Sequence, residues 1–183
     1  MNSAHDVQSM LDKLAAQESF HVEMVCLGNI CRSPLAAAIL SNRASEIVHP
    51  KVSVSSSGTA NYHEGEGAHP LFQQVWEESG YKHHHQARQF RREFFSQSDL
   101  ILCMDLTNRA IIWGAAQSDV DRSKIFMLRQ FDPTLTHINP TSPEAAALTV
   151  PDPWGKPIDA YYEVREMMER AITGLLNNLA QHA

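Results

Sequence analysis

Residues 25–34, VCLGNICRSP, bring a thiol, a turn, a guanidinium and a hydroxyl close together in the chain. Cys26 ends an apolar run, Gly28 permits a tight turn, and Arg32 and Ser33 follow where a helix should begin. Backbone N–H groups of a turn and of a helix N-terminus bind anions, and a guanidinium matches two phosphate oxygens. The same positive field favours the thiolate of Cys26. The pattern therefore predicts a nucleophile beside an oxyanion site.

This stretch has other interpretations. A nucleotide-binding loop would end in Gly-Lys-Ser/Thr, which this stretch lacks. Cys26 and Cys31 have no second ligand pair at a spacing suited to zinc, so we expect no metal. From spacing alone, two small buried thiols in an ordinary strand–helix unit would also fit. Cys103, inside an apolar run, is expected to be a plain core residue.

The elements that would position these groups alternate along the chain. Hydrophobic periodicity predicts strands at 21–26, 51–57, 99–104 and within 124–131, and helices at 3–18, 33–46, 69–79, 89–97, 105–116 and 159–180. This alternation predicts a single α/β domain with a four-stranded parallel sheet flanked by helices on both faces. Ligands of such folds bind beyond the carboxyl ends of the strands, where Cys26 lies.

Composition excludes several classes of protein. The formal net charge of -6 disfavours a nucleic-acid binder, and no apolar run reaches the roughly 18 residues of a membrane span. The N-terminus does not resemble a secretory signal. Three cysteines without a small-secreted pattern indicate a reducing compartment, so we expect a cytoplasmic protein.

With these residues in view, the sequence resembles the low-molecular-weight protein tyrosine phosphatases. The longer pattern C-x-G-N-x-C-R-S-P after an apolar strand is far more specific than Cys and Arg alone. Four further stretches resemble the family in its own order: VSSSGT at 54–59, HQARQF at 85–90, LILCMD at 100–105 and VPDPW at 150–154. The resemblance covers most of residues 22–180. It implies a flavodoxin-like three-layer fold and hydrolysis of phosphotyrosine in proteins without metal or cofactor.

The resemblance also implies roles for single residues. Cys26 would be the nucleophile, Arg32 would bind phosphate, and Asp152 would serve as general acid and then base. The spacing of Asp152 alone would favour an ordinary turn residue between two prolines. Phosphate binding and loop support would fall to Leu27, Gly28, Asn29, Ile30, Cys31, Ser33 and Ser56.

Within this set, Asn29 and Ser56 would hold the loop in shape, Ser56 through Ser33. Ser33 would lower the basicity of the thiolate and aid its departure. Asp105 and His85 match polar positions that support the surroundings of the site.

Tyr62 and Trp154 match the aromatic residues that flank the substrate cleft. The family's commonest pattern has Tyr after Asp-Pro, where this chain has Trp154. A tryptophan keeps a stacking face but narrows the cleft, which leaves the substrate preference open. Cys31 matches a second thiol that can form a disulfide with the nucleophile and so protect it from further oxidation.

Three competing functions share this scaffold. Arsenate reductases need further redox cysteines, whereas only Cys103 follows Cys31 here. A non-catalytic phosphoprotein-binding module would not need Cys26, Arg32 and Asp152 together. Related arginine phosphatases carry Thr at the position of Ile30, so tyrosine is favoured over arginine.

Two segments exceed the family's usual length. Residues 1–20 are expected to form an N-terminal helical extension of the domain at 21–183, and the helix either covers one edge of the fold or mediates self-association. Residues 133–149 are an expanded connection that would shape the cleft, with one short helical turn near 144–150. The histidines of KHHH at 82–85 lack acidic or thiol partners and are expected to lie in a solvated loop, His85 excepted.

Overall fold

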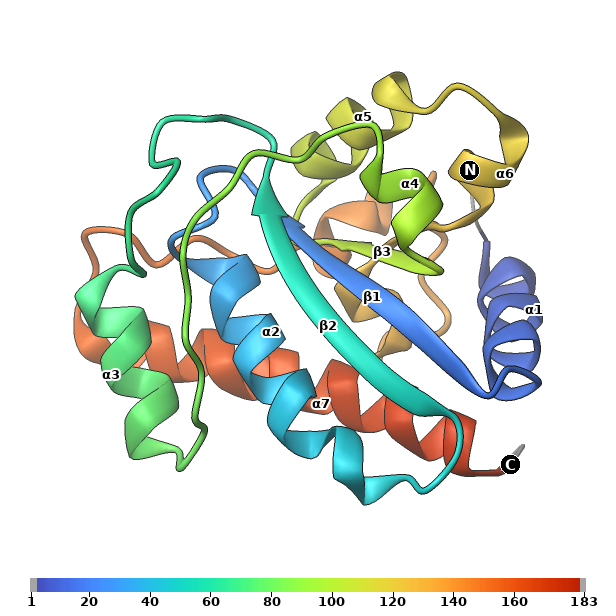
Figure 1. The fold of residues 1–183 in the computed structure, drawn as a ribbon, viewed down its shortest axis with the longest axis horizontal. Helices are drawn as coiled ribbons and strands as arrows, with labels where there is room; N and C mark the ends of the chain where they lie inside the picture. The colour runs from blue at the N-terminus through green and yellow to red at the C-terminus, as the bar shows by residue number, and fades with distance from the viewer. Residues whose placement is uncertain (1–2, 182–183) are drawn as a thin grey trace.

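A four-stranded parallel sheet forms the centre of the computed structural model, which describes residues 3–181. The strands are β1 (Ser19–Cys26), β2 (Lys51–Gly58), β3 (Leu100–Cys103) and β4 (Ile125–Met127), in the order β2-β1-β3-β4 (Figure 1). The predicted α/β fold with one parallel sheet is confirmed. Strand β4 has only three residues, because the chain turns into a 3₁₀ helix at Leu128–Phe131.

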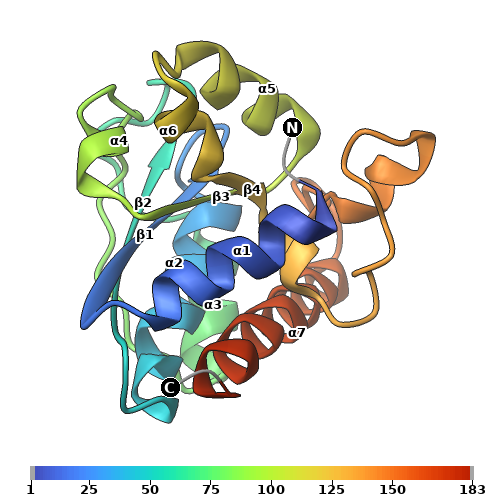
Figure 2. The same ribbon diagram turned by 90° about the vertical axis from the view of Figure 1, so that its right-hand side faces the viewer.

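Four helices cover one face of the sheet. These are α1 (Ala4–Ala15), α2 (Arg32–Arg43), α3 (Pro70–Glu78) and α7 (Ile158–Gln181), and Figure 2 shows α1 lying beside α7. The predicted apolar stripe of α7 is buried in this layer at Tyr161, Val164, Met168, Ile172 and Leu175. The predicted helix at 33–46 continues past α2 as a 3₁₀ helix at Ala44–Glu46.

Three other helices cover the opposite face. Helix α5 (Leu106–Ala115) packs on β3 and β4, with α4 (Phe94–Gln97) and α6 (Asp119–Ser123) beside it (Figures 1 and 2). Helix α4 occupies only the last part of the predicted helix at 89–97. Helix α6 was not predicted; its signal is the capping box of Ser118 and Asp121.

The N-terminal helix α1 covers the fold with its apolar stripe. Met10, Leu11 and Leu14 are buried in the main core, against the side of α7. This stripe therefore stabilises its own chain, and self-association through α1 stays a prediction. The described residues leave out 1–2 of the predicted extension at 1–20 and 182–183 of the predicted domain at 21–183.

Two further predictions concern the connections and the membrane. The helical turn predicted near 144–150 is a 3₁₀ helix at Pro143–Leu148. Within residues 3–181, no helix is both long enough and apolar enough to span a membrane.

Candidate active site

The loop between β1 and α2 is built around Asn29. Its φ of 55° lies in the left-handed region, which asparagine tolerates better than most residues. Its side-chain amide donates to Ser33 Oγ and to Ser56 Oγ, each at 2.9 Å, and its Oδ1 accepts from the backbone N–H of Arg88 at 2.9 Å. His85 Nε2 donates to the Asn29 carbonyl at 2.5 Å. The loop is thus fixed from three separate segments.

Ser56 reaches the loop by a different route from the predicted one. The resemblance implied an action through Ser33, but the hydroxyl of Ser56 contacts the amide of Asn29 instead. Asn29 lies between the two serines because its NH₂ group carries two hydrogens, one for each hydroxyl. The amide of Asn29 therefore links the hydroxyls of the two supporting serines.

Ser33 connects this network to the thiol. Its hydroxyl donates to Cys26 Sγ at 3.0 Å, and both residues are almost fully buried, with 0% and 2% of their surface exposed. A hydroxyl that donates to sulfur stabilises the thiolate more than the thiol, because the charged acceptor forms the stronger hydrogen bond. This geometry fits the role that the resemblance implied for Ser33.

The guanidinium of Arg32 is only partly used by the protein. Nη1 donates to Asp105 Oδ2 at 2.8 Å and to the carbonyl of Val150 at 2.9 Å. Nε is buried and has no partner among the described residues, and Nη2 lies 3.7 Å from Asp152 Oδ2. The edge formed by Nε and Nη2 therefore stays open to a ligand with two oxygens.

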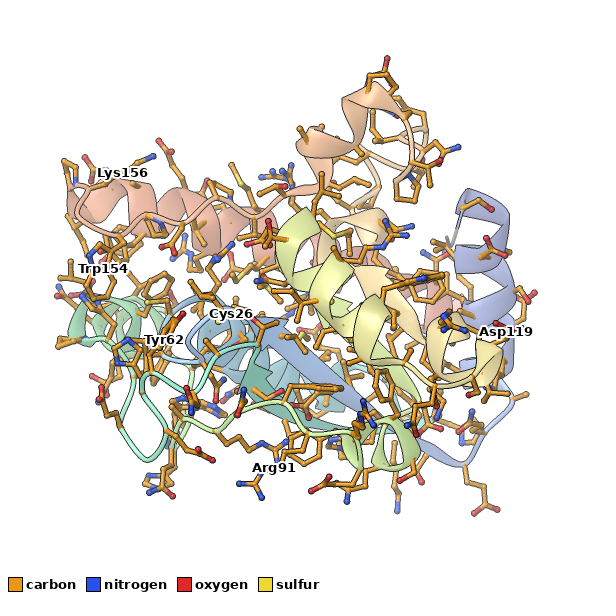
Figure 3. The ribbon with its side chains drawn as sticks, turned by 90° about the horizontal axis from the view of Figure 1, so that it is seen from above. Cys26, Tyr62, Arg91, Asp119, Trp154 and Lys156 are labelled. Atoms are coloured by element: carbon orange, nitrogen blue, oxygen red, sulfur yellow. The ribbon has the colours of Figure 1, made fainter. Side chains whose placement is uncertain are left out.

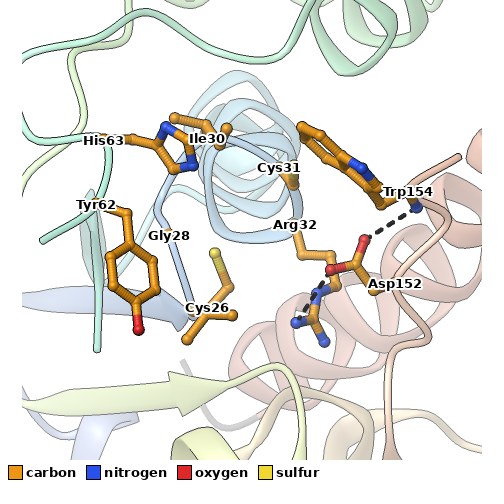
Figure 4. A pocket seen from close by; sticks show the side chains of 10 residues that line it. Cys26, Gly28, Ile30, Cys31, Arg32, Tyr62, His63, Asp152 and Trp154 are labelled. Atoms are coloured by element: carbon orange, nitrogen blue, oxygen red, sulfur yellow. Dashed lines mark hydrogen bonds and ion pairs between the residues drawn. The ribbon is translucent and has the colours of Figure 1, made fainter. Parts of the chain in front are cut away.

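A cavity of about 250 Å³ lies at the mouth of this loop. Figure 3 places Cys26, which lines the cavity, at the carboxyl end of β1, and Figure 4 shows Cys26 with Tyr62 and Trp154 on opposite sides of it. The two aromatic side chains are exposed by 72% and 57%. The lining residues are Cys26, Leu27, Gly28, Ile30, Cys31, Arg32, Tyr62, His63, Asp152 and Trp154. Asn29, Ser33 and Ser56 do not line the cavity; Asn29 supports the loop from within it, through its hydrogen bonds to the two serines.

Asp152 enters the cavity from the loop before α7. Its Oδ1 accepts from the backbone N–H of Trp154 at 3.1 Å, which fixes the turn between Pro151 and Pro153. The side chain is 44% exposed, so the carboxyl group can exchange protons with solvent. Asp152 is thus both a turn residue, as its spacing alone indicated, and a carboxyl group facing the thiol's cavity (Figure 4).

Two histidines of the site were missed by the sequence analysis. His69, the N-cap of α3, packs against Trp154 with ring centroids 4.8 Å apart, and its backbone N–H donates to Ile30 at 2.7 Å. His63 lines the cavity, and its Nδ1 donates to Glu66 at 2.9 Å. In the sequence, a role for His63 in the site was indicated only by its position directly after Tyr62. His69 meets the site by tertiary packing, which no local pattern reports.

The two remaining cysteines have different surroundings. Burial, together with nearby Cys26 and Asp152, raises the pKa of Cys31 to about 12, so this side chain stays a thiol at neutral pH. Complete burial raises the pKa of Cys103 still further, as fits the predicted core residue. All three cysteines are free.

The expanded connection does not shape the cavity as expected. None of residues 133–149, all of which are described, lines it. The connection packs instead against α5, where the carbonyl of Pro140 accepts from Arg109.

The KHHH segment at 82–85 is only partly exposed, because His83 is half-buried against Trp76. Residues 3–181 contain no group of His, Cys, Asp or Glu arranged to hold a metal.

Comparisons with known proteins agree with this geometry. Residues 21–183 match the family model described as low molecular weight phosphotyrosine protein phosphatase. A low molecular weight protein-tyrosine-phosphatase of Streptomyces coelicolor is 37% identical over 159 residues, which are 86% of this chain and 92% of the relative. A phosphatase A of Mycobacterium tuberculosis is 33% identical over 86% of this chain and 90% of its own.

Solved structures show the same fold. A protein tyrosine phosphatase of Entamoeba histolytica superposes with a TM-score of 0.76 at 28% identity, over 88% of this chain and 97% of that one. An arginine phosphatase of Geobacillus stearothermophilus gives 0.71 at 29% identity, over 88% and 94%. The chain therefore belongs to the low molecular weight phosphotyrosine protein phosphatase family, which is a family of hydrolases.

Proposed function

We propose that this protein hydrolyses phosphotyrosine in protein substrates through a phosphocysteine intermediate. The observation that carries the proposal is the open edge of Arg32 in the cavity that also holds Cys26 and Asp152. A phosphate placed there meets a nucleophile, a planar double donor and a carboxyl group at once. No metal or cofactor takes part in the steps below.

The first step transfers the phosphoryl group to sulfur. The thiolate of Cys26 attacks phosphorus, while Arg32 Nε and Nη2 hold two of the phosphate oxygens. The bond to the phenolic oxygen breaks, and Asp152 gives that oxygen its proton. The N-terminus of α2 adds N–H groups and the positive end of its dipole, which balance the charge of the transferring group.

The second step returns the enzyme to its starting state. The carboxylate of Asp152 takes a proton from water, whose oxygen attacks phosphorus. The sulfur–phosphorus bond breaks, inorganic phosphate leaves, and Ser33 stabilises the departing thiolate by the hydrogen bond already formed at 3.0 Å. Dividing the reaction in this way replaces one difficult displacement by two easier ones.

An aromatic substrate suits the walls of the cavity. Tyr62 and Trp154 offer two exposed rings at its sides, and Ile30 adds an apolar wall. A phosphotyrosine ring between them would gain stacking contacts that an aliphatic phosphoester cannot make.

The three free thiols favour a reducing environment, so we place this activity in the cytoplasm.

Phosphoarginine is the second candidate substrate, because arginine phosphatases are among the structural neighbours. Its guanidinium could also lie between two aromatic rings. The apolar side chain of Ile30, however, offers it no hydrogen-bond acceptor. Tyrosine is therefore the preferred proposal.

Steady-state hydrolysis without added metal tests both candidates. We expect turnover of a phosphotyrosine peptide well above that of phosphoarginine, and no reduction of arsenate. Cys26→Ser should bind phosphate but show no turnover, because a serine hydroxyl is not ionised near neutral pH. If phosphoarginine were hydrolysed faster than the phosphotyrosine peptide, phosphoarginine would be the preferred substrate. Activity of Cys26→Ser would show that Cys26 is not the nucleophile.

A further inference from the structure

Trp154 forms one wall of the active-site cavity although it is largely exposed. Its backbone is held by the turn of Asp152, whose Oδ1 accepts from the Trp154 N–H at 3.1 Å. This hydrogen bond constrains the backbone but does not restrict the rotation of the indole about its side-chain bonds. Ordering a large side chain costs rotamer freedom, so an indole that serves as a wall needs support from a neighbouring group.

His69 provides this support from the start of α3. The ring centroids of His69 and Trp154 are 4.8 Å apart, with 55° between the ring planes. The imidazole also stacks on Tyr161, at 6.0 Å and 15°, and Tyr161 is buried in the core. The exposed indole therefore rests on a ring that is itself packed against the core.

His69 is also fixed by hydrogen bonds at both its side chain and its backbone. As the N-cap of α3, its Nδ1 accepts from the backbone N–H of Leu71 at 3.3 Å. Its own backbone N–H donates to the carbonyl of Ile30 at 2.7 Å. Ile30 belongs to the loop between β1 and α2, which binds phosphate in the proposed mechanism. One residue thus joins the phosphate-binding loop to the indole on the wall of the cavity.

The residue type at this N-cap fits both tasks. Ser, Thr, Asp and Asn, the usual N-cap residues, accept a hydrogen bond from the helix but have no ring. Phenylalanine has a ring but no acceptor atom. The imidazole of His69 has a flat face for Trp154 and an acceptor nitrogen for α3, so it supports the indole while it begins the helix.

We propose that His69 is a positioning residue that sets the preference for aryl phosphates, because it holds the Trp154 indole where it contacts the ring of the substrate. The inference rests on the proposed function and adds a residue that does not itself line the cavity. An alkyl phosphate reaches the same phosphate-binding loop but has no ring to place against the indole. Loss of the support should therefore weaken the binding of aryl ligands and leave that of alkyl ligands unchanged.

Isothermal titration of the full chain with phenylphosphonate and methylphosphonate tests this inference. The two ligands share the phosphonate group and differ in the ring, and neither is hydrolysed, so their affinities do not depend on turnover. We expect the parent to bind phenylphosphonate more tightly than methylphosphonate. His69→Asn keeps an acceptor for α3 and removes the ring. This variant should bind phenylphosphonate about 3–10-fold more weakly than the parent and methylphosphonate equally well.

Steady-state kinetics with phenyl phosphate give a second measurement on the same variant. His69→Asn should raise KM, because the indole contacts the ring in the ground state and in the transition state alike. The value of kcat should stay within about twofold of the parent, since His69 does not touch the reacting atoms. A fall in kcat without a rise in KM would contradict a role limited to holding the indole.

His69→Phe is the matched control, because it keeps a ring and removes the acceptor. Its melting temperature should fall, since α3 loses its N-cap, while its affinity for phenylphosphonate should stay near that of the parent. His69→Asn should show the opposite pattern, with the melting temperature retained and the affinity lowered. In the background of Trp154→Ala, His69→Asn should cause no further loss, because the supported indole is already absent.

Several results would overturn the inference. These are equal affinity of the parent for the two phosphonates, equal losses for both ligands in His69→Asn, no loss for phenylphosphonate in that variant, or an undiminished loss in the Trp154→Ala background. The proposed function fails on a different result, the absence of phenyl phosphate hydrolysis by the parent. The phosphonate affinities are measured independently of that hydrolysis.

Discussion

At the scale of single residues, Arg32 divides its guanidinium between the fold and the ligand. Nη1 is held by Asp105 and the Val150 carbonyl, and this leaves the Nε–Nη2 edge directed at the cavity. A lysine could keep the charge but not both the anchor and the double contact to phosphate. We expect Arg32→Lys to lower kcat/KM for an aryl phosphate by roughly 10²–10³-fold. Activity within a few-fold of the parent would contradict the two-oxygen contact.

Asp152 is tested by the leaving group of the substrate. Phenyl phosphate needs a proton on its departing oxygen, whereas nitrophenyl phosphate gives a phenolate that is already stable. Asp152→Ala should therefore slow phenyl phosphate by about 10²–10⁴-fold and nitrophenyl phosphate much less. Single-turnover rates over a series of aryl phosphates measure this dependence. Equal losses for all of them would mean that Asp152 acts only through its turn.

Cys31 should protect the nucleophile from irreversible oxidation. Peroxide converts the thiolate of Cys26 to a sulfenic acid, and the thiol of Cys31 then attacks that sulfur, so that a disulfide and water form. Because the pKa of Cys31 is raised to about 12, this closure should become faster as the pH rises above neutral. A dithiol should restore the peroxide-treated parent but not Cys31→Ser. Full recovery of Cys31→Ser would rule out the protective pair.

At the scale of elements, a close approach fixes α7 against the 3₁₀ helix at 128–131. A Cβ on Gly174 would overlap the carbonyl oxygen of Phe131 and press on Pro133. Gly174→Ala should therefore destabilise the protein by about 1–3 kcal/mol, because backbone atoms cannot move aside as a side chain can. Thermal unfolding measures the loss.

Gly114 in α5 is the matched control for this prediction. A Cβ there would meet no atom within 4 Å, so Gly114→Ala should be stabilising by about 0.5–1 kcal/mol through the helix propensity of alanine. A loss of stability in Gly174→Ala together with a gain in Gly114→Ala would show that the close packing of α7 causes the loss. Equal effects would show that it reflects only the loss of glycine.

The elements also show which features could be predicted from the sequence. Three strands follow from local apolar runs and β2 from alternation, and the position of Cys26 was predicted because it is the last residue of one such run. His69 and the link from Asn29 to Ser56 could not be predicted, because they depend on segments brought together by the fold.

At the scale of the whole molecule, the catalytic loop is held by parts of the chain that lie far from it in sequence. His85 and Arg88, in the connection before α4, both donate to Asn29. Arg88 is held in turn by Glu23 of β1, which is 1% exposed, at 2.9 Å. Residues 85–88, strand β1 and the catalytic loop thus form one network. We expect the stability of this network to depend on whether His85 is protonated.

Burial lowers the pKa of His85 from 6.5 to about 4, and burial also lowers the pKa of His21 and of His83. Between pH 6.5 and about pH 4, His85 binds a proton in the unfolded chain but not in the folded protein. The free energy of unfolding should therefore decrease as the pH falls from 6.5 to 4. Melting temperatures across this range should fall less steeply for His85→Gln, which keeps a donor for Asn29 but does not titrate. The exposed neighbour His84 gives the matched control His84→Gln, whose profile should follow the parent. A parental slope in His85→Gln would show that other groups carry the acid sensitivity of the fold.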